Sequence, residues 1–517
     1  MAESSALPAG IASPSRRFLI TLAAQSAKSA FSFLAGIVVA RGLGPNDFGN
    51  LSFLLGSFAG IRAILDLGSS YAFFTLTAQR PRSRVFYLYY ASWFLLVQMG
   101  LPVLCMMVLL PDRTLDTLWL SQPRDLVVLA FLASTMQYAL WPQLIQLGEV
   151  VRHTHLSQSL TLAIAVMHLL LVAALHAVGW LTIPVVLSLT ATEFLVGSVY
   201  AFFLMPRPWL AGAPPDTLPS VFREFRIYCQ PLIVSTALTA ASGWAEVWML
   251  QHFGGAVAQA YYSLGLQFSF ISLITTTALQ NILWREMAEL EGRGDEAQIR
   301  NVYLKSSRAL LLTAAIPAAF LVAWTPEVTE LALGTRYRDA ASVVAVFFLY
   351  PIGQSLYTLA VVTFLAMRAT RVLSILSSCY MGLGVVVSYF ALAPATATIP
   401  GLGLGALGLS LKLVVLSFAY VLVLEYWIRR TKGWPHDWAH RLRLLGVVFA
   451  LSGLARLAGA TAVAWLPPLE AMIATALIFI AAVGAVLARW PGLAGVSVAH
   501  RDEFFVRLRR ATAWRAP

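Results

Sequence analysis

The sequence is short of charge for its length. Only 12% of its 517 residues are Asp, Glu, Lys or Arg, whereas 59% are hydrophobic, and the mean hydropathy is +0.75. A soluble domain carries about 25% charged residues, so this chain lacks the polar surface needed to face water on all sides. The shortage argues against an ordinary soluble fold and predicts that lipid covers most of the surface.

Cysteine and the common site motifs are also scarce. Cys105, Cys229 and Cys379 lie within apolar runs and show no C-x-x-C spacing, which argues against a disulfide framework. The sequence has no P-loop and no H-E-x-x-H. The stretch Gly403 to Gly408 reads G-x-G-x-x-G, but we interpret it as small residues that open a membrane helix. We therefore predict no metal site and no cofactor.

Long apolar runs, in contrast, are abundant. A membrane-spanning helix needs about 20 mostly apolar residues. Fourteen segments meet this length approximately: 18–40, 50–78, 85–110, 125–148, 156–178, 181–204, 227–252, 256–284, 302–324, 339–366, 372–393, 401–426, 444–466 and 469–489. The sequence therefore predicts an all-α polytopic membrane protein with about 14 transmembrane helices.

The basic residues collect in alternate loops. The loops on the side of the N-terminus, with the two tails, hold 27 of the 36 Lys and Arg, and the opposite loops hold five. Since cytoplasmic loops carry the Lys/Arg excess, both termini are predicted to be cytoplasmic. The net charge of +12 then faces anionic lipid headgroups, and we expect no nucleic-acid partner.

Two short stretches resemble each other and divide the chain into halves. "ARGLGPNDFGNLS" at 40–52 aligns with "LQHFGGAVAQAYYS" at 250–263, with Leu43-Gly44 matched to Phe253-Gly254. We interpret each as a tight hairpin that joins the first two helices of a six-helix bundle, as in transporters built from parallel repeats. The predicted parts are a cytoplasmic tail 1–17, an N-lobe 18–204, a cytoplasmic linker 205–226, a C-lobe 227–426, a cytoplasmic loop 427–443, a helix pair 444–489 and a basic cytoplasmic tail 490–517.

Ionisable residues inside predicted helices are candidates for function. Each costs roughly 2.5–3.5 kcal/mol at the membrane centre, so it usually faces a partner or a water-filled cavity. The candidates are Lys28, Arg62, Asp66, Glu193, Glu246, Lys412 and Arg456. Arg62 and Asp66 are four residues apart on one helix face and form either a structural ion pair or part of a site. Together these residues predict an aqueous, slightly cationic cavity suited to an anionic or amphipathic cargo.

The first hairpin resembles that of a known family. "ARGLGPNDFGNLSFLLGSFAGIRAILDLGSS" is similar to the A-R-x-L-G-x-x-D-F-G-x-Y pattern, followed by D-L-G, of the polysaccharide transporter (Wzx-type flippase) family. That family belongs to the multidrug/oligosaccharidyl-lipid/polysaccharide exporter (MOP) superfamily. In the second half, Pro231-Leu232-Ile233 and Phe253-Gly254 are similar too. This chain departs from the family pattern in two places, with Leu51 near the usual Tyr and Glu246 in place of the usual Asp.

The resemblance implies a flippase of a bacterial cytoplasmic (inner) membrane. Its cargo is an undecaprenyl-pyrophosphate-linked oligosaccharide, the repeat unit of O-antigen, capsule or exopolysaccharide, moved from the inner to the outer leaflet by alternating access between two six-helix lobes. On this hypothesis Lys28, Arg62 and Lys412 hold the pyrophosphate, and Gln25, Gln267, Trp244 and Trp248 contact sugars. Asp66, Glu246 and Glu193 serve ion coupling or structural pairing, and the pair 444–489 lines a groove for the lipid tail.

Other partners and two rival functions complete the predictions. Membrane lipids surround the chain, and a polymerase and other polysaccharide assembly proteins are candidate partners. One rival is a multidrug extruder of the same superfamily, which usually has twelve helices and a more acidic cavity. The other is a membrane glycosyltransferase or polymerase, which needs catalytic groups in a sizeable outer loop. The largest outer loops, 111–124 and 325–338, carry no such constellation, so we predict a transporter and not an enzyme.

Overall fold

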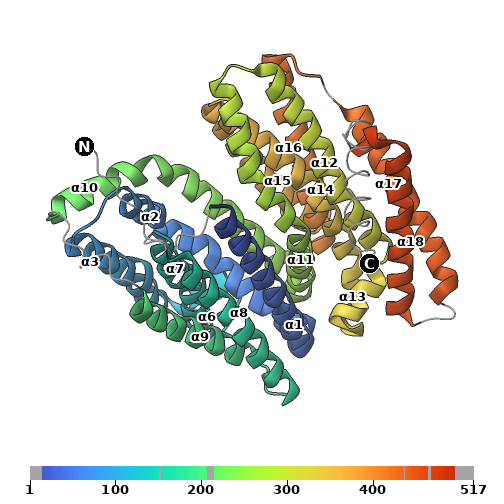
Figure 1. Ribbon diagram of the computed structural model, residues 1–517. Helices are drawn as coiled ribbons and strands as arrows, with labels where there is room; N and C mark the ends of the chain where they lie inside the picture. The colour runs from blue at the N-terminus through green and yellow to red at the C-terminus, as the bar shows by residue number, and fades with distance from the viewer. Residues whose placement is uncertain (1–13, 151–152, 206–214, 436, 464–466, 495–517) are drawn as a thin grey trace, which may run out of the picture. The chain divides into compact units, whose positions relative to one another are not determined.

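The computed structural model describes residues 14–150, 153–205, 215–435, 437–463 and 467–494. These residues form helices joined by short turns and contain no strand (Figure 1). Eleven helical segments in this part of the chain are long and apolar enough to cross a membrane. The all-helical membrane fold is thus confirmed, and the total of fourteen spans stays a prediction. The chain divides into two compact units, Met1–Ala260 and Tyr261–Pro517.

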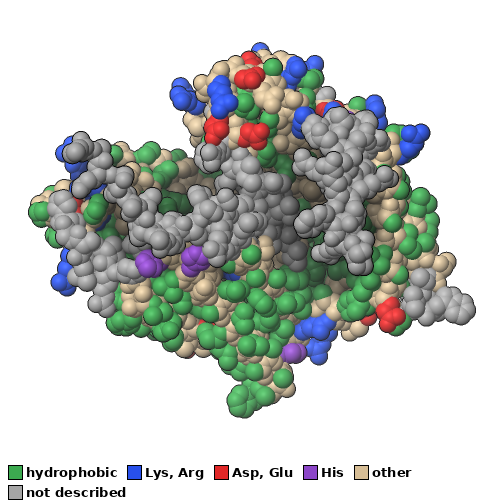
Figure 2. All heavy atoms as spheres, viewed as in Figure 1, with side chains coloured by type: hydrophobic (Ala, Val, Ile, Leu, Met, Phe, Trp, Pro, Cys, Tyr) green, Lys and Arg blue, Asp and Glu red, His purple; other side chains and the backbone are tan. Residues whose placement is uncertain are grey.

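The first unit contains the helices up to the first part of α11. In chain order they are α1 (Pro14–Asp66), α2 (Ser69–Gln79), α3 (Arg84–Trp93), η1 (Phe94–Gly100), α4 (Leu101–Leu104), η2 (Cys105–Leu109), α5 (Asp112–Trp119), α6 (Arg124–Thr135), η3 (Met136–Leu140), α7 (Trp141–Val150), α8 (Thr154–Ala177), α9 (Ile183–Leu204), α10 (Leu218–Cys229), η5 (Gln230–Leu232) and α11 (Ile233–Gly292). Figure 2 shows hydrophobic side chains over α8 and α9, where Leu170, Leu195 and Phe203 are exposed. Exposed apolar residues on helices of this length are expected where lipid is the solvent.

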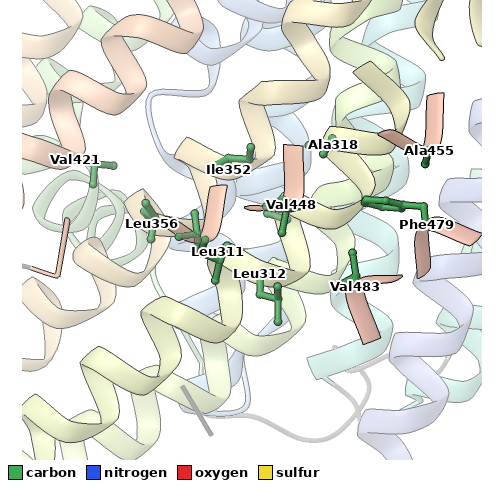
Figure 3. Close-up of a cluster of buried hydrophobic side chains, with 14 residues drawn as sticks. Leu311, Leu312, Ala318, Ile352, Leu356, Val421, Val448, Ala455, Phe479 and Val483 are labelled. Atoms are coloured by element: carbon green, nitrogen blue, oxygen red, sulfur yellow. The ribbon is translucent and has the colours of Figure 1, made fainter. Parts of the chain in front are cut away.

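The second unit contains the rest of α11 and the remaining helices, which bury two clusters of apolar side chains. They are α12 (Glu296–Ala323), α13 (Thr325–Leu333), η6 (Thr335–Ala340), α14 (Ala341–Ala366), α15 (Thr370–Leu392), α16 (Gly405–Lys432), α17 (Trp438–Val463), α18 (Pro468–Arg489) and η7 (Pro491–Ala494). Figure 3 shows one of these clusters, in which Leu311, Ile352, Val448 and Phe479 meet from α12, α14, α17 and α18. The C-terminal helix pair therefore packs on the second unit through buried side chains.

The predicted hairpin at residues 40–52 is sharper than the sequence suggested. Helical backbone continues on both sides of Gly44, which is the single non-helical residue inside α1, with φ 77° and ψ 171°. Gly255 interrupts α11 with nearly the same angles, φ 76° and ψ −179°. The two stretches therefore do share a local structure, but the counterpart of Gly44 is Gly255 and not Gly254. Left-handed φ values favour glycine because it has no Cβ, which explains glycine at both breaks.

Hydrogen bonds show that α1 turns back on itself at Gly44. Near the start of α1, Gln25 bonds to Gln158, and Gln158 bonds to Glu149 of α7. Just past the end of α1, Ser70 accepts a hydrogen bond from Gln143, also of α7. An unbroken helix would hold residues 25 and 66 about 60 Å apart, so the two limbs of α1 must lie side by side, as Figure 1 shows.

The second limb of α1 packs closely against the first part of α11. A Cβ on Gly49 would overlap the backbone of Ala256, and a Cβ on Gly60 would come 2.8 Å from the carbonyl oxygen of Ala240. Glycine at these positions lets the two backbones approach. The sequence assigned residues 227–252 to the second lobe, whereas in the structure this part of α11 belongs to the first compact unit.

Three further features were not foreseen. Predicted helix 50–78 is interrupted at Leu67 and Gly68, which have φ values of 50° and 81°. Three segments, η1, η2 and η3, are π-helical. The predicted linker 205–226 contains most of α10, which covers an aromatic cluster through Val221 and Phe225.

Candidate functional site

Two basic residues inside the membrane segment of α1 form no salt bridge within the described residues. Lys28 lies on the first limb and Arg62 on the second, and both side chains are partly buried. Within the described residues neither forms a hydrogen bond or an ion pair. The Arg62 guanidinium lies over the Tyr138 ring, 5.1 Å from its centre, and its buried Nε has no hydrogen-bond partner. A cation–π contact of this kind offsets only part of the cost of desolvating a full charge.

The predicted Arg62–Asp66 ion pair is not formed. The Asp66 carboxylate instead accepts hydrogen bonds from the Ser69 hydroxyl at 2.9 Å, the Ser70 hydroxyl at 2.6 Å and the Ser70 amide at 3.0 Å. The helix breaks directly after Asp66, so its carboxylate satisfies donors at the exposed N-terminus of α2. The helix is continuous from Arg62 to Asp66, so the i, i+4 spacing holds, but the Asp66 carboxylate is engaged by Ser69 and Ser70 and the Arg62 guanidinium lies over Tyr138.

Two π-helical segments, η1 and η3, each place one side chain against Asp66 or Arg62. Gln98 lies in η1 and donates to Asp66 at 3.3 Å and to Ser69 at 3.0 Å. Tyr138 lies in η3 beneath Arg62. A π turn changes the rotation of the residues that follow it, and such turns are frequent at functional sites. η1 therefore supplies a hydrogen-bond donor to Asp66, and η3 supplies the aromatic ring that contacts Arg62.

Aromatic rings line one face of α11 in the first unit. Trp244 stacks on Trp248 with ring centres 6.3 Å apart, and Trp248 stacks on His252 at 4.6 Å. The Trp248 indole also donates to the backbone carbonyl of Thr117 at 3.2 Å, which fixes its orientation. The two predicted sugar-contacting tryptophans therefore belong to one stack. Its third member, His252, was missed, although the spacing i, i+4, i+8 was visible in the sequence.

Glu193, which had no explanation in the sequence, has a partner in the structure. The Nδ1 atom of His168, on α8, lies 2.6 Å from the Oε2 atom of Glu193. Of the other predicted residues, Gln25 bonds to Gln158, and Glu246 is partly exposed on α11. In the second unit Gln267 and Lys412 are partly exposed on α11 and α16.

Arg456 has a structural role in the second unit. Its guanidinium forms an ion pair with Glu327 and lies over the Trp324 ring at 4.2 Å. It therefore ties α17 to α13, and it is not one of the cations without a counterion. Within the residues that the structure describes, no group of three or more His, Cys, Asp or Glu side chains is arranged to hold a metal ion.

A buried ion pair in the second unit was missed altogether. Arg441 of α17 and Glu425 of α16 approach to 2.8 Å, and their side chains are 2% and 4% exposed. Ser307 accepts from Arg441 at 2.7 Å, and Tyr303 donates to Glu425 at 2.8 Å, so α12 joins the network. This pair was not predicted, because Arg441 lies in the predicted cytoplasmic loop 427–443.

Comparison with solved structures shows a fold shared with MOP-superfamily transporters. The chain is similar to the lipid II flippase MurJ in an inward closed conformation, with a TM-score of 0.67 and 11% identity over 91% of this chain and 99% of that chain. It is similar to an inward-facing multidrug resistance MATE family transporter, with a TM-score of 0.59 and 14% identity over 78% of this chain and 94% of that chain. A MOP superfamily transporter from Pyrococcus furiosus gives a TM-score of 0.51 and 14% identity over 81% and 95%. No protein-family model and no curated protein matches the sequence.

Proposed function

We propose that this chain flips an undecaprenyl-pyrophosphate-linked oligosaccharide from the inner to the outer leaflet of a bacterial cytoplasmic membrane. The repeat unit of an O-antigen, capsule or exopolysaccharide is the expected headgroup, and alternating access is the expected mechanism. The MOP-type transporter fold supports a transport function. The motifs of the first hairpin support this cargo, because they resemble those of the polysaccharide transporter family.

The observation that carries the proposal is that two cations of α1, Lys28 and Arg62, form no salt bridge within the described residues. A charge at the membrane centre costs roughly 2.5–3.5 kcal/mol, and an internal salt bridge would offset that cost. Lys28 and Arg62 have no such salt bridge within the described residues. An anionic ligand would supply the missing counterion, and a guanidinium is well suited to phosphate because it presents several donors in one plane. Lys412 of the second unit is a third candidate for the same role.

The stacked rings of α11 provide a matching surface for the saccharide. Sugar rings present apolar C–H faces edged by hydroxyl groups, and such faces pack on aromatic side chains that also carry a polar edge. Trp244, Trp248 and His252 form such a surface. Gln25 and Gln267 are candidate hydrogen-bond partners for sugar hydroxyls.

Charge movement favours export of this cargo. Moving about two negative charges outward across an inside-negative membrane releases roughly 4.6 kcal/mol at 100 mV. The potential therefore contributes to transport before any coupling ion is considered. Asp66 accepts a hydrogen bond from the Ser70 amide at the start of α2, which favours a structural role for Asp66. Glu246 of α11 is the second candidate for ion coupling.

The test is flipping of a lipid-linked oligosaccharide by the purified protein in proteoliposomes. We expect wild-type protein to expose the saccharide on the opposite leaflet, and Lys28→Ala and Arg62→Ala to abolish this without loss of folded protein. Arg113→Ala is the matched control, because Arg113 is an exposed cation on α5. Full activity of both α1 variants would refute the role of these cations. Transport of cationic dyes in place of the saccharide would favour a multidrug extruder.

A further inference from the structure

Helix α10 is clamped onto the first unit, and the clamp fixes its rotation about its own axis. Arg82, in the turn between α2 and α3, is 2% exposed and donates to the Leu76 carbonyl at 2.9 Å and to Glu224 of α10 at 2.7 Å. In the same turn the Ser83 amide donates to the Asp216 carboxylate at 2.9 Å, and the Asp216 amide donates to the Ser83 hydroxyl at 3.1 Å. These bonds hold the residue that precedes α10 and the middle of the helix, so they determine which side chains of α10 are exposed.

The apolar stripe of α10 is wider than the contact that α10 makes with the protein. Val221 and Phe225 are buried in the aromatic cluster of the first unit. Leu218 and Phe222, which are four residues apart, are 61% and 54% exposed. At 3.6 residues per turn, the line through Leu218 and Phe222 lies about 60° around the helix from the line through the two buried residues. The stripe therefore continues from the protein contact onto an uncovered face.

This uncovered face lies at the edge of the membrane. Arg84, directly after the clamped turn, begins the segment Arg84–Leu109, which is long and apolar enough to span the bilayer. α10 packs on α2 and α3 beside the start of this segment, as Figure 1 shows. At its other end α10 passes through η5 directly into α11. α10 is therefore at the level of the lipid headgroups, on the side that is predicted to be cytoplasmic.

Arginine is in excess around this face. Both acidic residues nearby, Asp216 and Glu224, already form ion pairs with the arginines of the α2–α3 turn. Three exposed arginine side chains form no hydrogen bond or ion pair within the part of the chain that the structure describes: Arg84, Arg223 and Arg226. Three positive charges next to the uncovered apolar face are therefore available to an anionic partner.

The order of side chains around α10 is that of a helix lying in the membrane interface. Arg226 follows Phe222 by four residues and lies about 60° further from the buried side than the line through Leu218 and Phe222. In an interfacial helix the apolar face enters the boundary between headgroups and acyl chains, and the basic residues beside it reach the phosphates. A guanidinium suits this role because several of its donors lie in one plane. Burial of the exposed apolar side chains among acyl chains is favourable as well.

We propose that α10 is a docking surface for the anionic phospholipids of the cytoplasmic leaflet. Leu218 and Phe222 enter the acyl region, and the arginines Arg84, Arg223 and Arg226 bind lipid phosphates. The occupant is the bilayer itself, because the surface adjoins a membrane-spanning segment and its positive charge complements anionic headgroups. Since α10 leads through η5 into α11, docking holds the start of α11 at a fixed level in the membrane. This role does not depend on the identity of the cargo.

Spin labels on α10 of the full chain test the apolar contact. With the three native cysteines replaced by alanine, a label at Phe222→Cys is compared with one at Ile227→Cys in nanodiscs of phosphatidylcholine and phosphatidylglycerol. Ile227 is the matched control, because it is 63% exposed but lies about 140° around the helix from Phe222. We expect the label at 222 to collide mainly with oxygen, which concentrates in lipid, and the label at 227 mainly with a water-soluble nickel chelate. Equal access of the nickel chelate to both labels would overturn the proposal. A protein as the true occupant predicts that equality, since the nanodiscs contain no other chain.

Photolabelling of the same segment tests the charge. Photoactivatable phosphatidylglycerol and phosphatidylcholine compete in the nanodiscs, and the ratio of the two on residues 218–229 measures the preference for the anionic lipid. We expect Arg223→Gln/Arg226→Gln to lower this preference by about fivefold for each arginine removed. Arg429→Gln/Arg430→Gln is the matched control, because it removes two exposed arginines from the end of α16. An unchanged preference in the α10 variant, or an equal fall in the α16 control, would overturn the proposal. Neither measurement uses the saccharide, so both are decided independently of the proposed function.

Discussion

The buried ion pair between Arg441 and Glu425 is expected to contribute strongly to the free energy of unfolding of the second unit. Arg441 reaches Glu425 at 2.8 Å and 2.9 Å and Ser307 at 2.7 Å, with both charged side chains almost fully buried. In Arg441→Met the Glu425 carboxylate keeps only the Tyr303 hydroxyl as a donor. Removing one partner of a buried pair costs about 3–5 kcal/mol, because the remaining charge is left without compensation.

The assay is denaturant unfolding of the purified protein in detergent micelles, which yields the free energy of unfolding. We expect Arg441→Met to lose about 3–5 kcal/mol. The double variant Arg441→Met/Glu425→Gln should lose less, because no unpaired charge stays buried. Arg308→Met is the matched control: its pair with Asp437 spans 2.5 Å but is 30% and 20% exposed, so we expect a loss of at most about 1 kcal/mol.

Two results would refute this reasoning. The first is a loss for Arg441→Met no larger than that of the Arg308 control. The second is a double variant less stable than the single one, since that would mean the lone carboxylate is not the source of the cost. Either result would show that water reaches the pair in the folded protein.

Three further predictions use the same protein preparation. Gly49→Ala should lower the free energy of unfolding by about 1–3 kcal/mol, because its Cβ overlaps Ala256, whereas Gly243→Ala in open space on α11 should not; equal effects would contradict the close helix packing. Trp248→Ala should weaken binding of the lipid-linked oligosaccharide roughly threefold to tenfold, and unchanged affinity would remove the ring stack from the site. Arg456→Gln should lower the melting temperature and leave the flipping rate per folded molecule unchanged; a lost rate would return Arg456 to the cargo-binding cations.

Several helices were predictable from apolar length alone. Segments 156–178, 181–204, 372–393 and 469–489 match α8, α9, α15 and α18 to within two residues at each end. Each is a continuous apolar run bounded by polar or turn residues, so hydropathy defines both ends. Hydropathy contains no information on a break of one residue, and this is why the extent of the turn at Gly44 and the interruption at Gly68 were not predicted.

The partners of the candidate residues were less predictable. Lys28, Arg62 and Glu193 were identified because a charge in an apolar run is visible in the sequence. Their partners depend on helix rotation and packing: Glu193 contacts a residue 25 positions away, and Arg62 turns from Asp66 toward a ring on another element. Arg441 was missed for a related reason, since a charge in a polar loop gives no indication that it is buried.

The π-helical turn of η1 makes the structure sensitive to the number of residues in this segment. Its hydrogen bonds close over one more residue than those of an α-helix, so deleting a single residue between 94 and 97 would let a regular helix form there. Gln98 lies within this turn, so its side chain would no longer be directed by the wider π-helical geometry. The amide would leave Asp66 and Ser69, although no residue of that contact had been replaced. The number of residues in this segment therefore determines where Gln98 points, and substitutions do not test this because they leave that number unchanged.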